Sequence, residues 1–297
     1  MIWESVVAID PEAFVQKLLS AEFSIDHWSL LGVGQNNIVI LANQEWVFRY
    51  PLHEDAAESL AHEISVLRTI HGRLPVPTPN PEIVADVPGL DWPVMGYPMI
   101  GGEALDRAAI ASFSAEATTK LGKTLGRFMR TLHSTSASRF SDSELLNKDS
   151  AELWERISTD AKKFLKPRVE STEWKRISRK LGKSREKIKR FEFEPMLRHG
   201  DFGSGNFLFD RQNQLSGVLD FGNAGFGDPA MDFAGVIATD PSENLLNRVI
   251  SAYPVADEMI DRARIYRETF ALQQALLGAK ADDEVEIEDG LASYLDR

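Results

Sequence analysis

The stretch LRHGDFGSGNFLFD, residues 197–210, places His199, Asp201 and Asn206 in a loop of small residues between two apolar runs. A second stretch, QLSGVLDFG, follows at once and carries Asp220 just after its own apolar residues. Short apolar runs bounded by turn residues predict β-strands. The two stretches therefore predict a hairpin in which each strand has a carboxylate at one end. A single Asp in a turn is ordinary, but two on paired strands require a chemical reason.

Phosphoryl transfer supplies such a reason. An Asp in a loop can accept the proton of an attacking hydroxyl group. The carbonyl oxygen of Asn206 and the carboxylate of Asp220 are the oxygen ligands that Mg²⁺ takes in proteins, usually together with substrate phosphates. A base and two oxygen ligands on one hairpin therefore predict a centre for phosphoryl transfer.

The spacing of these residues follows the protein-kinase pattern of His-x-Asp, four residues, Asn, and then Asp-Phe-Gly after a short hairpin. His199, Asp201 and Asn206 fit it in type and order, as do Asp220, Phe221 and Gly222. Asp-Phe-Gly alone is a weak signal, but the joint pattern on two strands is specific. The alternative is that Asp201 and Asn206 are merely turn-capping residues.

With these motifs, the chain resembles the aminoglycoside phosphotransferase family, in its aminoglycoside and macrolide kinase branch, within the protein-kinase-like fold. The resemblance lies in HGD where protein kinases have His-Arg-Asp, and in GDPAMDFA at residues 227–234. It implies an α+β, bilobal protein-kinase-like fold. Residues 1–98 would form a small mixed-sheet lobe that binds nucleotide, residues 99–297 a larger, mainly helical catalytic and substrate-binding lobe, and residues 97–102 the hinge.

The resemblance also assigns the nucleotide site. The loop GVGQNN, with Gly32, Gly34 and Asn37, would cover the phosphates, although an ordinary hairpin turn explains it equally well. Arg49 stands where kinases carry a strand lysine, and Arg can bind phosphate through two hydrogen bonds. Glu63, on the following helix, would pair with Arg49. The alternatives are a surface Arg and a solvated Glu.

Further roles follow from the resemblance alone. Met99 and Ile100 would lie nearest the purine at the hinge. His199 and Asp232 would support the catalytic loop, and His133 would be a buried structural histidine. His62 and Glu63 begin like a zinc-protease HExxH motif, but Val66 occupies the position of the second His.

Hydrophobic periodicity predicts most of the remaining elements. Leu60, Ile64 and Leu67 predict a helix that ends before Gly72. A second helix is expected to end near His133. Helices are also expected over residues 145–195, over 241–253 and over 257–280. The acidic stretch DDEVEIEDG (residues 282–290) is expected to be solvated.

Composition restricts the class of protein. The chain has 297 residues, 43% of them hydrophobic and 26% charged, which is typical of a globular protein. No apolar run approaches the roughly 20 residues of a membrane span, and the start lacks the pattern of a signal peptide. Cysteine is absent, which excludes disulfides and thiolate metal sites and favours a cytoplasmic location.

The charge is unevenly distributed. Of the net charge of −12, residues 162–190 contribute +10, from 13 Lys and Arg against 3 Glu, so the other residues sum to −22. A mostly acidic surface disfavours nucleic acid and membrane partners and favours a cationic small molecule. The basic segment is predicted to be a solvated helical pair or a mobile insertion, with a site for nucleic acid or another anionic partner as the alternative.

Together these features predict a kinase that transfers the γ-phosphoryl group of ATP or GTP, with Mg²⁺, to a hydroxyl group of an aminoglycoside antibiotic. Asp228 and Glu268 are the candidate substrate-binding acids, with ordinary solvated or capping carboxylates as the alternative. A macrolide or another metabolite is the alternative substrate, and a non-catalytic nucleotide-binding module is the alternative function. The choice of nucleotide, the acceptor hydroxyl and the oligomeric state stay open.

Overall fold

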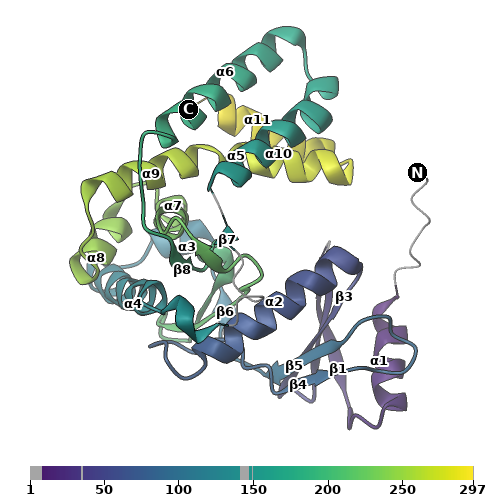
Figure 1. The fold of residues 1–297 in the computed structure, drawn as a ribbon. Coiled ribbons are helices and arrows are strands. Elements are labelled where there is room, and N and C mark those ends of the chain that lie inside the picture. Colours follow the sequence, from purple (N-terminus) through teal and green to yellow (C-terminus); the bar gives the residue numbers. More distant parts are fainter. Residues whose placement is uncertain (1–8, 35, 141–146, 149, 297) are drawn as a thin grey trace. The chain divides into compact units, whose positions relative to one another are not determined.

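The computed structural model describes residues 9–34, 36–140, 147–148 and 150–296 (Figure 1). The chain divides into two compact units. The first comprises Met1–Ala104 and Asn206–Ala224, and the second comprises Leu105–Gly205 and Gly225–Arg297. The predicted assignment of nucleotide binding to residues 1–98 and of catalysis to residues 99–297 stays a prediction.

The first unit is built on a five-stranded antiparallel sheet with the strand order β1-β2-β3-β5-β4. The strands predicted around the loop GVGQNN are confirmed. The elements of this part are α1 (Pro11–Ser20), β1 (Trp28–Val33), β2 (Asn37–Ala42), β3 (Trp46–Pro51), α2 (Glu54–Ile70), β4 (Ile83–Ala85) and β5 (Val94–Pro98).

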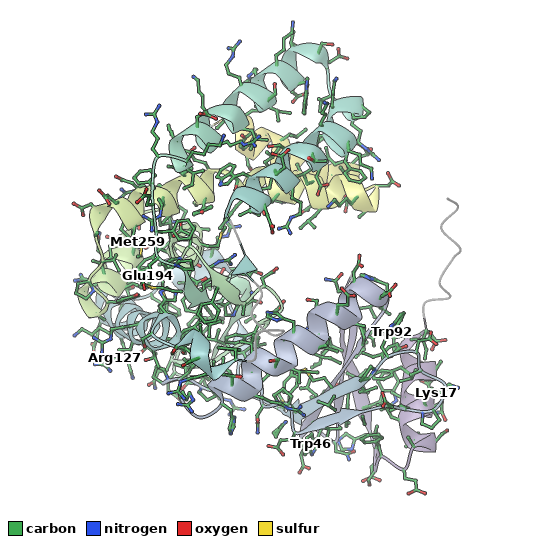
Figure 2. The ribbon with its side chains drawn as sticks, in the orientation of Figure 1. Lys17, Trp46, Trp92, Arg127, Glu194 and Met259 are labelled. Atoms are coloured by element: carbon green, nitrogen blue, oxygen red, sulfur yellow. The ribbon has the colours of Figure 1, made fainter. Side chains whose placement is uncertain are left out.

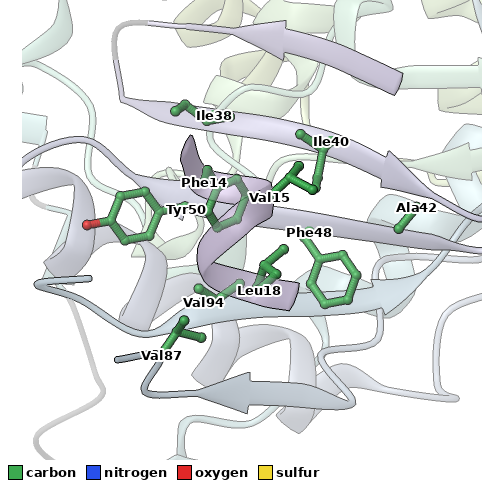
Figure 3. Close-up of a cluster of buried hydrophobic side chains, with 10 residues drawn as sticks. All are labelled: Phe14, Val15, Leu18, Ile38, Ile40, Ala42, Phe48, Tyr50, Val87 and Val94. Carbon is green, nitrogen blue, oxygen red and sulfur yellow. The ribbon is translucent and has the colours of Figure 1, made fainter. Parts of the chain in front are cut away.

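The core of this sheet lies under α1 (Figure 3). Phe14 and Leu18 are one helical turn apart on α1, so they point to the same side and reach the apolar side chains of β2 and β3. Asp10 starts the helix, because its side chain accepts the N–H of Ala13 at 2.8 Å. Trp46 and Trp92, labelled in Figure 2, pack against this cluster.

A second, three-stranded sheet in the same unit has the order β10-β9-β6, with β6 (Glu103–Ala104), β9 (Phe207–Phe209) and β10 (Leu215–Val218). The antiparallel pair β9–β10 confirms the predicted hairpin. Hydrogen bonds join the hairpin to the amino-terminal residues. Ser216 Oγ donates to the carbonyl of Gly101 at 2.7 Å, and the N–H of Val218 donates to Pro77 at 3.0 Å.

The second unit is mainly helical. Its small sheet has the order β7-β11-β8, with β7 (Asn147–Lys148), β8 (Met196–Arg198) and β11 (Gly225–Gly227). Its helices are α3 (Arg107–Ala111), α4 (Ala115–His133), α5 (Ser150–Asp160), α6 (Ser171–Ile188), α7 (Ala230–Thr239), α8 (Asn244–Ala252), α9 (Asp257–Glu268), α10 (Phe270–Ala281) and α11 (Glu284–Leu295). Short helical turns lie at Ala137–Arg139, Ala161–Leu165, Lys166–Arg168 and Ser204–Asn206.

The helix predicted over residues 257–280 is confirmed as two helices, which end and begin on either side of Thr269. The acidic stretch was predicted to be solvated, and most of its acids are exposed. It also forms the start of α11, a helix that was not predicted, where the side chain of Asp283 accepts the N–H of Glu286 at 3.1 Å. Ile287 and Tyr294 are buried on one face of α11, so the acids occupy its outer face and conceal its helical period.

The basic segment is partly neutralised within the second unit. Arg168 pairs with Asp282 and Glu284, next to the start of α11. Lys180 donates to the carbonyl of Tyr294 at 2.5 Å, in the last turn of α11, where cations are favourable. Arg185 pairs with Glu155 on α5 at 2.6 Å. Part of the +10 charge therefore holds α6 to the elements around it.

Within the described ranges, none of the helices is long and apolar enough to cross a membrane.

Candidate functional site

In the first unit, Glu63 connects two of the predicted sites. It lies on α2, it is 1% exposed, and its Oε1 accepts a hydrogen bond from Arg49 Nη1 at 2.8 Å. The same oxygen accepts the backbone N–H of Phe221 at 3.1 Å. One buried carboxylate therefore joins the predicted phosphate-binding Arg of β3 to the turn that contains Asp220.

Burial and charge shift the pKa values of this pair. Burial raises the pKa of the Glu63 carboxyl above its usual value, and Arg49 opposes that shift without cancelling it. Burial lowers the pKa of Arg49, but Glu63, Tyr97 and Asp220 together raise it, so that it lies above its ordinary value. Arg49 is therefore charged at any physiological pH, in a setting whose negative groups stabilise that charge.

The hairpin brings Asn206 and Asp220 to one end of paired strands. Val218 pairs with Phe207, and the N–H of Leu219 donates to the carbonyl of Asn206 at 2.9 Å. Asp220 is the next residue. The backbone pairing therefore places both predicted metal ligands at the same end of the hairpin, as the sequence pattern anticipated.

The backbone at Asp220 is unusual. Its φ is +60°, in the left-handed region that Asp and Asn tolerate better than most residues. The N–H of Gly222 donates to Asp220 Oδ1 at 3.3 Å, which links the side chain to its own turn. Asp220 remains exposed, and Asn206 is half-buried. The turn therefore presents the carboxylate of Asp220 while holding its backbone.

These two residues suit Mg²⁺ by the chemistry of their donor atoms. A carboxylate and an amide oxygen are hard oxygen ligands, and Mg²⁺ completes its shell with water and phosphate oxygens. The left-handed turn at Asp220 and the pairing at Asn206 would hold both donors before a metal binds. Their role as ligands stays a prediction.

The glycine-rich loop has room for a ligand. Among the described residues, no atom lies within 4 Å of a Cβ built on Gly32, and Gly34 would meet only the carbonyl of Asn37 at 4.0 Å. Neither glycine has a positive φ there. Packing and backbone conformation therefore do not require glycine, whereas close approach of a ligand would. Gln35 of this loop lies outside the described residues.

Two polar atoms near this loop are buried without a hydrogen-bond partner among the described residues: Asn37 Oδ1 and Arg49 Nε. Buried polar atoms normally find partners. Arg49 Nε is a donor and suits a phosphate oxygen, whereas Asn37 Oδ1 is an acceptor and suits a hydroxyl group. Both residues were predicted to bind nucleotide, and these atoms are compatible with that prediction.

The predicted purine residues follow β5. Met99 is 42% exposed, and its N–H donates to the carbonyl of Glu45 at 2.7 Å. Ile100 packs over Gly217, where an added Cβ would lie 2.7 Å from Ile100 Cγ2. The exposed side chain of Met99 leaves it available to a ligand, and its contact with a purine stays a prediction.

In the second unit, Asp232 of α7 holds the loop that carries Asp201. Its Oδ2 accepts the N–H of His199 at 2.9 Å, and its Oδ1 accepts the N–H of Gly200 at 2.8 Å. A third bond, at 3.0 Å, joins Oδ2 to His133 Nε2. Burial raises the pKa of Asp232, but the hydrogen bond and charge interaction with His133, the charge interaction with His199 and the N–H of Gly200 outweigh burial, so the pKa lies below its ordinary value.

Because a carboxylate only accepts hydrogen bonds, His133 carries its proton on Nε2. His133 Nδ1 lies 3.3 Å from the hydroxyl of Tyr253, which gives the buried ring a second partner. Both polar atoms of the imidazole are thus bound, as expected for a structural histidine. Tyr253 was missing from the sequence prediction, since a contact 120 residues away leaves no local signal.

The same face of α7 supports the rest of the loop. A Cβ at Gly235 would lie 2.1 Å from the carbonyl oxygen of Phe202, so only glycine permits this approach. Thr239 Oγ1 accepts the N–H of Ser204 at 3.1 Å. With Asp232, these residues recur at spacings of three and four, so one face of α7 contacts the loop along its length. Asp232 was predicted from the resemblance, whereas Gly235 and Thr239 were not predicted.

This loop leaves Asp201 exposed. Its N–H lies 3.3 Å from His199 Nδ1, and its carbonyl accepts the N–H of Gly203 at 3.1 Å. Gly200 has a φ of +85°, which explains the glycine between His199 and Asp201. The backbone is therefore fixed while the carboxylate of Asp201 stays accessible. That geometry suits a general base, and the catalytic role stays a prediction.

The two candidate substrate acids differ in their surroundings. Asp228 is 2% exposed and accepts two hydrogen bonds from Arg262, at 2.8 and 3.1 Å, and one from Tyr266 at 3.1 Å. These contacts account for its carboxylate as part of the fold. Glu268 is half-buried and accepts Ser184 Oγ at 3.1 Å. Substrate binding by either stays a prediction, with less room for it at Asp228.

Comparison with known proteins shows which family and fold the chain matches. The profile of the phosphotransferase enzyme family (APH) matches residues 27–266. Viomycin phosphotransferase from Streptomyces vinaceus is 42% identical over 100 residues. The match covers 32% of this chain and 34% of that relative's length.

Two solved structures show the same fold. Wild-type aminoglycoside 2'-phosphotransferase-IIIa, solved as its GDP complex, matches with a TM-score of 0.84 and 23% identity over 97% of this chain and 98% of that one. Macrolide 2'-phosphotransferase type I matches with a TM-score of 0.70 and 18% identity over 97% and 98%. The fold class predicted from the sequence, α+β and protein-kinase-like, is confirmed. With its family profile matched over most of its length, the chain belongs to the phosphotransferase enzyme family.

Proposed function

We propose that this protein is a small-molecule kinase that transfers the γ-phosphoryl group of ATP or GTP to a hydroxyl group of an aminoglycoside. The observation that carries the proposal is the position of Glu63, whose one oxygen binds both Arg49 and the backbone of the Asp220 turn. A contact that joins a phosphate-binding cation to a metal-binding turn suits a nucleotide that is bound through both.

Three groups in the first unit would bind the donor nucleotide. Arg49 contributes a charged guanidinium whose Nε lacks a partner among the described residues, which suits a phosphate oxygen. The open space over Gly32 and Gly34 suits close approach of phosphate to the loop. Met99 and Ile100 would contact the purine.

Asp220 and Asn206 would hold Mg²⁺. When bound, the cation neutralises charge on the phosphate oxygens during transfer. The chain's own contribution is the rigid hairpin end that keeps both ligands in place, so that little reorganisation accompanies binding.

Asp201 would orient the substrate hydroxyl and accept its proton. The hydroxyl oxygen then forms a bond to the γ-phosphorus while the bond to the leaving nucleoside diphosphate breaks. His199 and Asp232 act on the loop backbone, since their hydrogen bonds hold the N–H groups of His199, Gly200 and Asp201.

The substrate class follows from charge and from the relatives. Residues other than 162–190 carry a net charge of −22, which favours a cationic acceptor. The solved relative named above is an aminoglycoside 2'-phosphotransferase, and the curated relative is a viomycin phosphotransferase. The cytoplasm, which supplies nucleoside triphosphate, is the proposed site of action.

The test is a substrate panel with ATP and with GTP, in which release of ADP or GDP is measured. The panel contains aminoglycosides, viomycin, a macrolide and an amino alcohol, each with Mg²⁺. Turnover of an aminoglycoside supports the proposal, and turnover of the macrolide alone would favour that substrate class instead. Tight nucleotide binding with no product from any acceptor would indicate a binding module.

The role of Asp201 has a direct test in the same assay. Asp201→Ala is expected to lower turnover by about 10²- to 10⁴-fold, the usual contribution of a positioned base. Asp257→Ala, which removes an exposed acid from the first turn of α9, is the matched control and keeps full turnover. Equal turnover of the two variants would exclude Asp201 as the base.

A further inference from the structure

A four-residue turn follows Asp220, and α2 binds both of its ends. The N–H of Ala224 donates to the carbonyl of Phe221 at 2.9 Å and closes the turn. In a two-residue hairpin, the remaining N–H of the first residue and the remaining carbonyl of the fourth bond to each other. Here two consecutive side chains of α2, His62 and Glu63, take those two groups instead.

The contact of His62 has a defined direction. His62 Nε2 lies 2.7 Å from the carbonyl oxygen of Ala224. A carbonyl oxygen only accepts, so Nε2 carries the hydrogen in either charge state of the ring. Ala224 and Phe221 are both fully buried. A buried carbonyl without a donor is unfavourable, so loss of the imidazole would favour a rearranged turn.

The same face of α2 approaches the middle of the turn. A Cβ at Gly222 would lie 3.3 Å from Ser59 Oγ and 3.9 Å from Glu63 Oε2. Ser59, His62 and Glu63 are spaced by three and four residues, so they lie on one side of the helix. Asp220, which directly precedes this turn, has its backbone in the left-handed region. A conformation of that kind persists only where its surroundings hold it.

We propose that His62 is a positioning residue for Asp220 and sets the affinity of the hairpin for the divalent cation. The inference rests on the proposed function, in which Asp220 is a metal ligand. His62 holds the end of the turn at Ala224, and Glu63 holds the end at Phe221, which follows Asp220 directly. Together they hold the backbone that presents Asp220. Groups that orient metal ligands typically change metal affinity about 10- to 100-fold when they are removed.

The experiment measures metal binding rather than catalysis. The full-length protein is saturated with ADP or GDP, whichever it binds, and titrated with Mn²⁺ while free Mn²⁺ is followed by electron paramagnetic resonance. His62→Ala is expected to weaken Mn²⁺ binding about 10-fold. His62→Gln keeps an N–H donor of similar reach and is expected to restore affinity to within about threefold of the wild type. His71→Ala, an exposed His at the end of α2, should match the wild type.

A second readout follows the turn itself. Amide hydrogen exchange of residues 221–225 is expected to be faster in His62→Ala and close to normal in His62→Gln. Wild-type Mn²⁺ affinity in His62→Ala, with Asp220→Ala losing affinity, would overturn the inference and leave the proposed function intact. Wild-type affinity in Asp220→Ala would instead remove Asp220 as a ligand, and with it the proposed metal site. If His62→Ala does not fold, His62→Phe, which fills the same space without a donor, replaces it, with the same expected loss and the same overturning result.

Discussion

Two buried carboxylates of this protein do the same structural task in different electrostatic settings. Glu63 of α2 holds the turn after Asp220, and Asp232 of α7 holds the loop before Asp201. Each accepts a backbone hydrogen bond from a distant segment that contains a predicted site residue, Glu63 from one N–H group and Asp232 from two. Burial raises the pKa of the Glu63 carboxyl. Burial also raises the pKa of Asp232, but its hydrogen bonds and charged neighbours lower it by more, so the net shift is downward.

The difference lies in the number and placement of the donors. Asp232 uses both oxygens and accepts from two backbone N–H groups and His133. Glu63 accepts hydrogen bonds from Arg49 and from the N–H of Phe221, both at Oε1. Since hydrogen bonds to the charged form offset burial, the anchor with three donors keeps its charge more firmly. A buried carboxylate therefore makes a strong anchor only when its donors are numerous enough.

The largest expected effect is the loss of the stronger anchor. Asp232→Ala leaves the N–H groups of His199 and Gly200 without their acceptor, and is expected to lower the free energy of unfolding by about 3–5 kcal/mol. Equilibrium unfolding in urea measures this. Asp232→Asn keeps the shape and one acceptor oxygen, so its loss should be smaller. A loss below about 1 kcal/mol for the Ala variant would contradict the account of Asp232 as the main anchor.

The close approach of α7 to the loop is the next test. Gly235→Ala places a Cβ against the carbonyl of Phe202 and is expected to lower the free energy of unfolding by about 1–3 kcal/mol, through overpacking. Gly182→Ala is the matched control, because no described atom lies within 4 Å of its added Cβ. That exposed site in α6 should be stabilised by about 0.5–1 kcal/mol through helix propensity. If both variants changed the free energy of unfolding in the same direction, the contact with Phe202 would be relieved without strain.

A smaller effect is expected at the weaker anchor. Glu63→Gln keeps an acceptor for the N–H of Phe221 and removes a charge that burial disfavours. The expected loss in the free energy of unfolding is about 1–2 kcal/mol, less than that of Asp232→Ala, and urea unfolding again measures it. Nucleotide affinity should fall too, because Arg49 loses its partner. A loss in unfolding free energy as large as that of Asp232→Ala would remove the distinction between the two anchors.

The smallest effects are those of acid pH, and they have opposite signs. Asp232 has a folded pKa below its ordinary 3.8, so its stabilisation is complete above that value and is lost as pH falls through the folded pKa. Glu63 has a folded pKa above its ordinary 4.5, so its ionisation opposes folding. The folded state therefore gains stability relative to the unfolded state as pH falls from the raised pKa to 4.5.

Measuring the free energy of unfolding from about pH 3 to 7 distinguishes these two opposite pH dependences. The stability of the wild type relative to Asp232→Asn should decline at the acid end, whereas its stability relative to Glu63→Gln should rise. Parallel curves for the two comparisons would show that the carboxylates respond to burial in the same way.

The chemistry-bearing motifs could be predicted from the sequence because their geometry is local. Asp201 and Asn206 lie in one loop, and Asp220 follows on the paired strand, so the spacing alone places Asn206 and Asp220 at one hairpin end. Asp232 could be proposed from the resemblance. Its three donors, by contrast, come from segments 32, 33 and 99 residues away, and their number emerged only with the fold.

Other features had no local signal. Asp228 was a candidate for substrate binding, yet Arg262, 34 residues later, occupies both its oxygens. His62 resembled part of a zinc motif, whereas in the structure its ring contacts the carbonyl of Ala224, 162 residues away. The helical period of α11 was hidden by its acids, because an exposed face carries little information about a buried one.

By itself, the sequence determined the chemistry available to this protein: a loop Asp, an amide and carboxylate pair on a hairpin, a strand Arg and a helix Glu. These depend on residue type and short spacing, which local backbone geometry translates directly into position. Only the tertiary structure decided which carboxylates became anchors and which stayed exposed. That choice depends on how many hydrogen-bond donors distant segments bring to a buried oxygen, and no local pattern encodes that number.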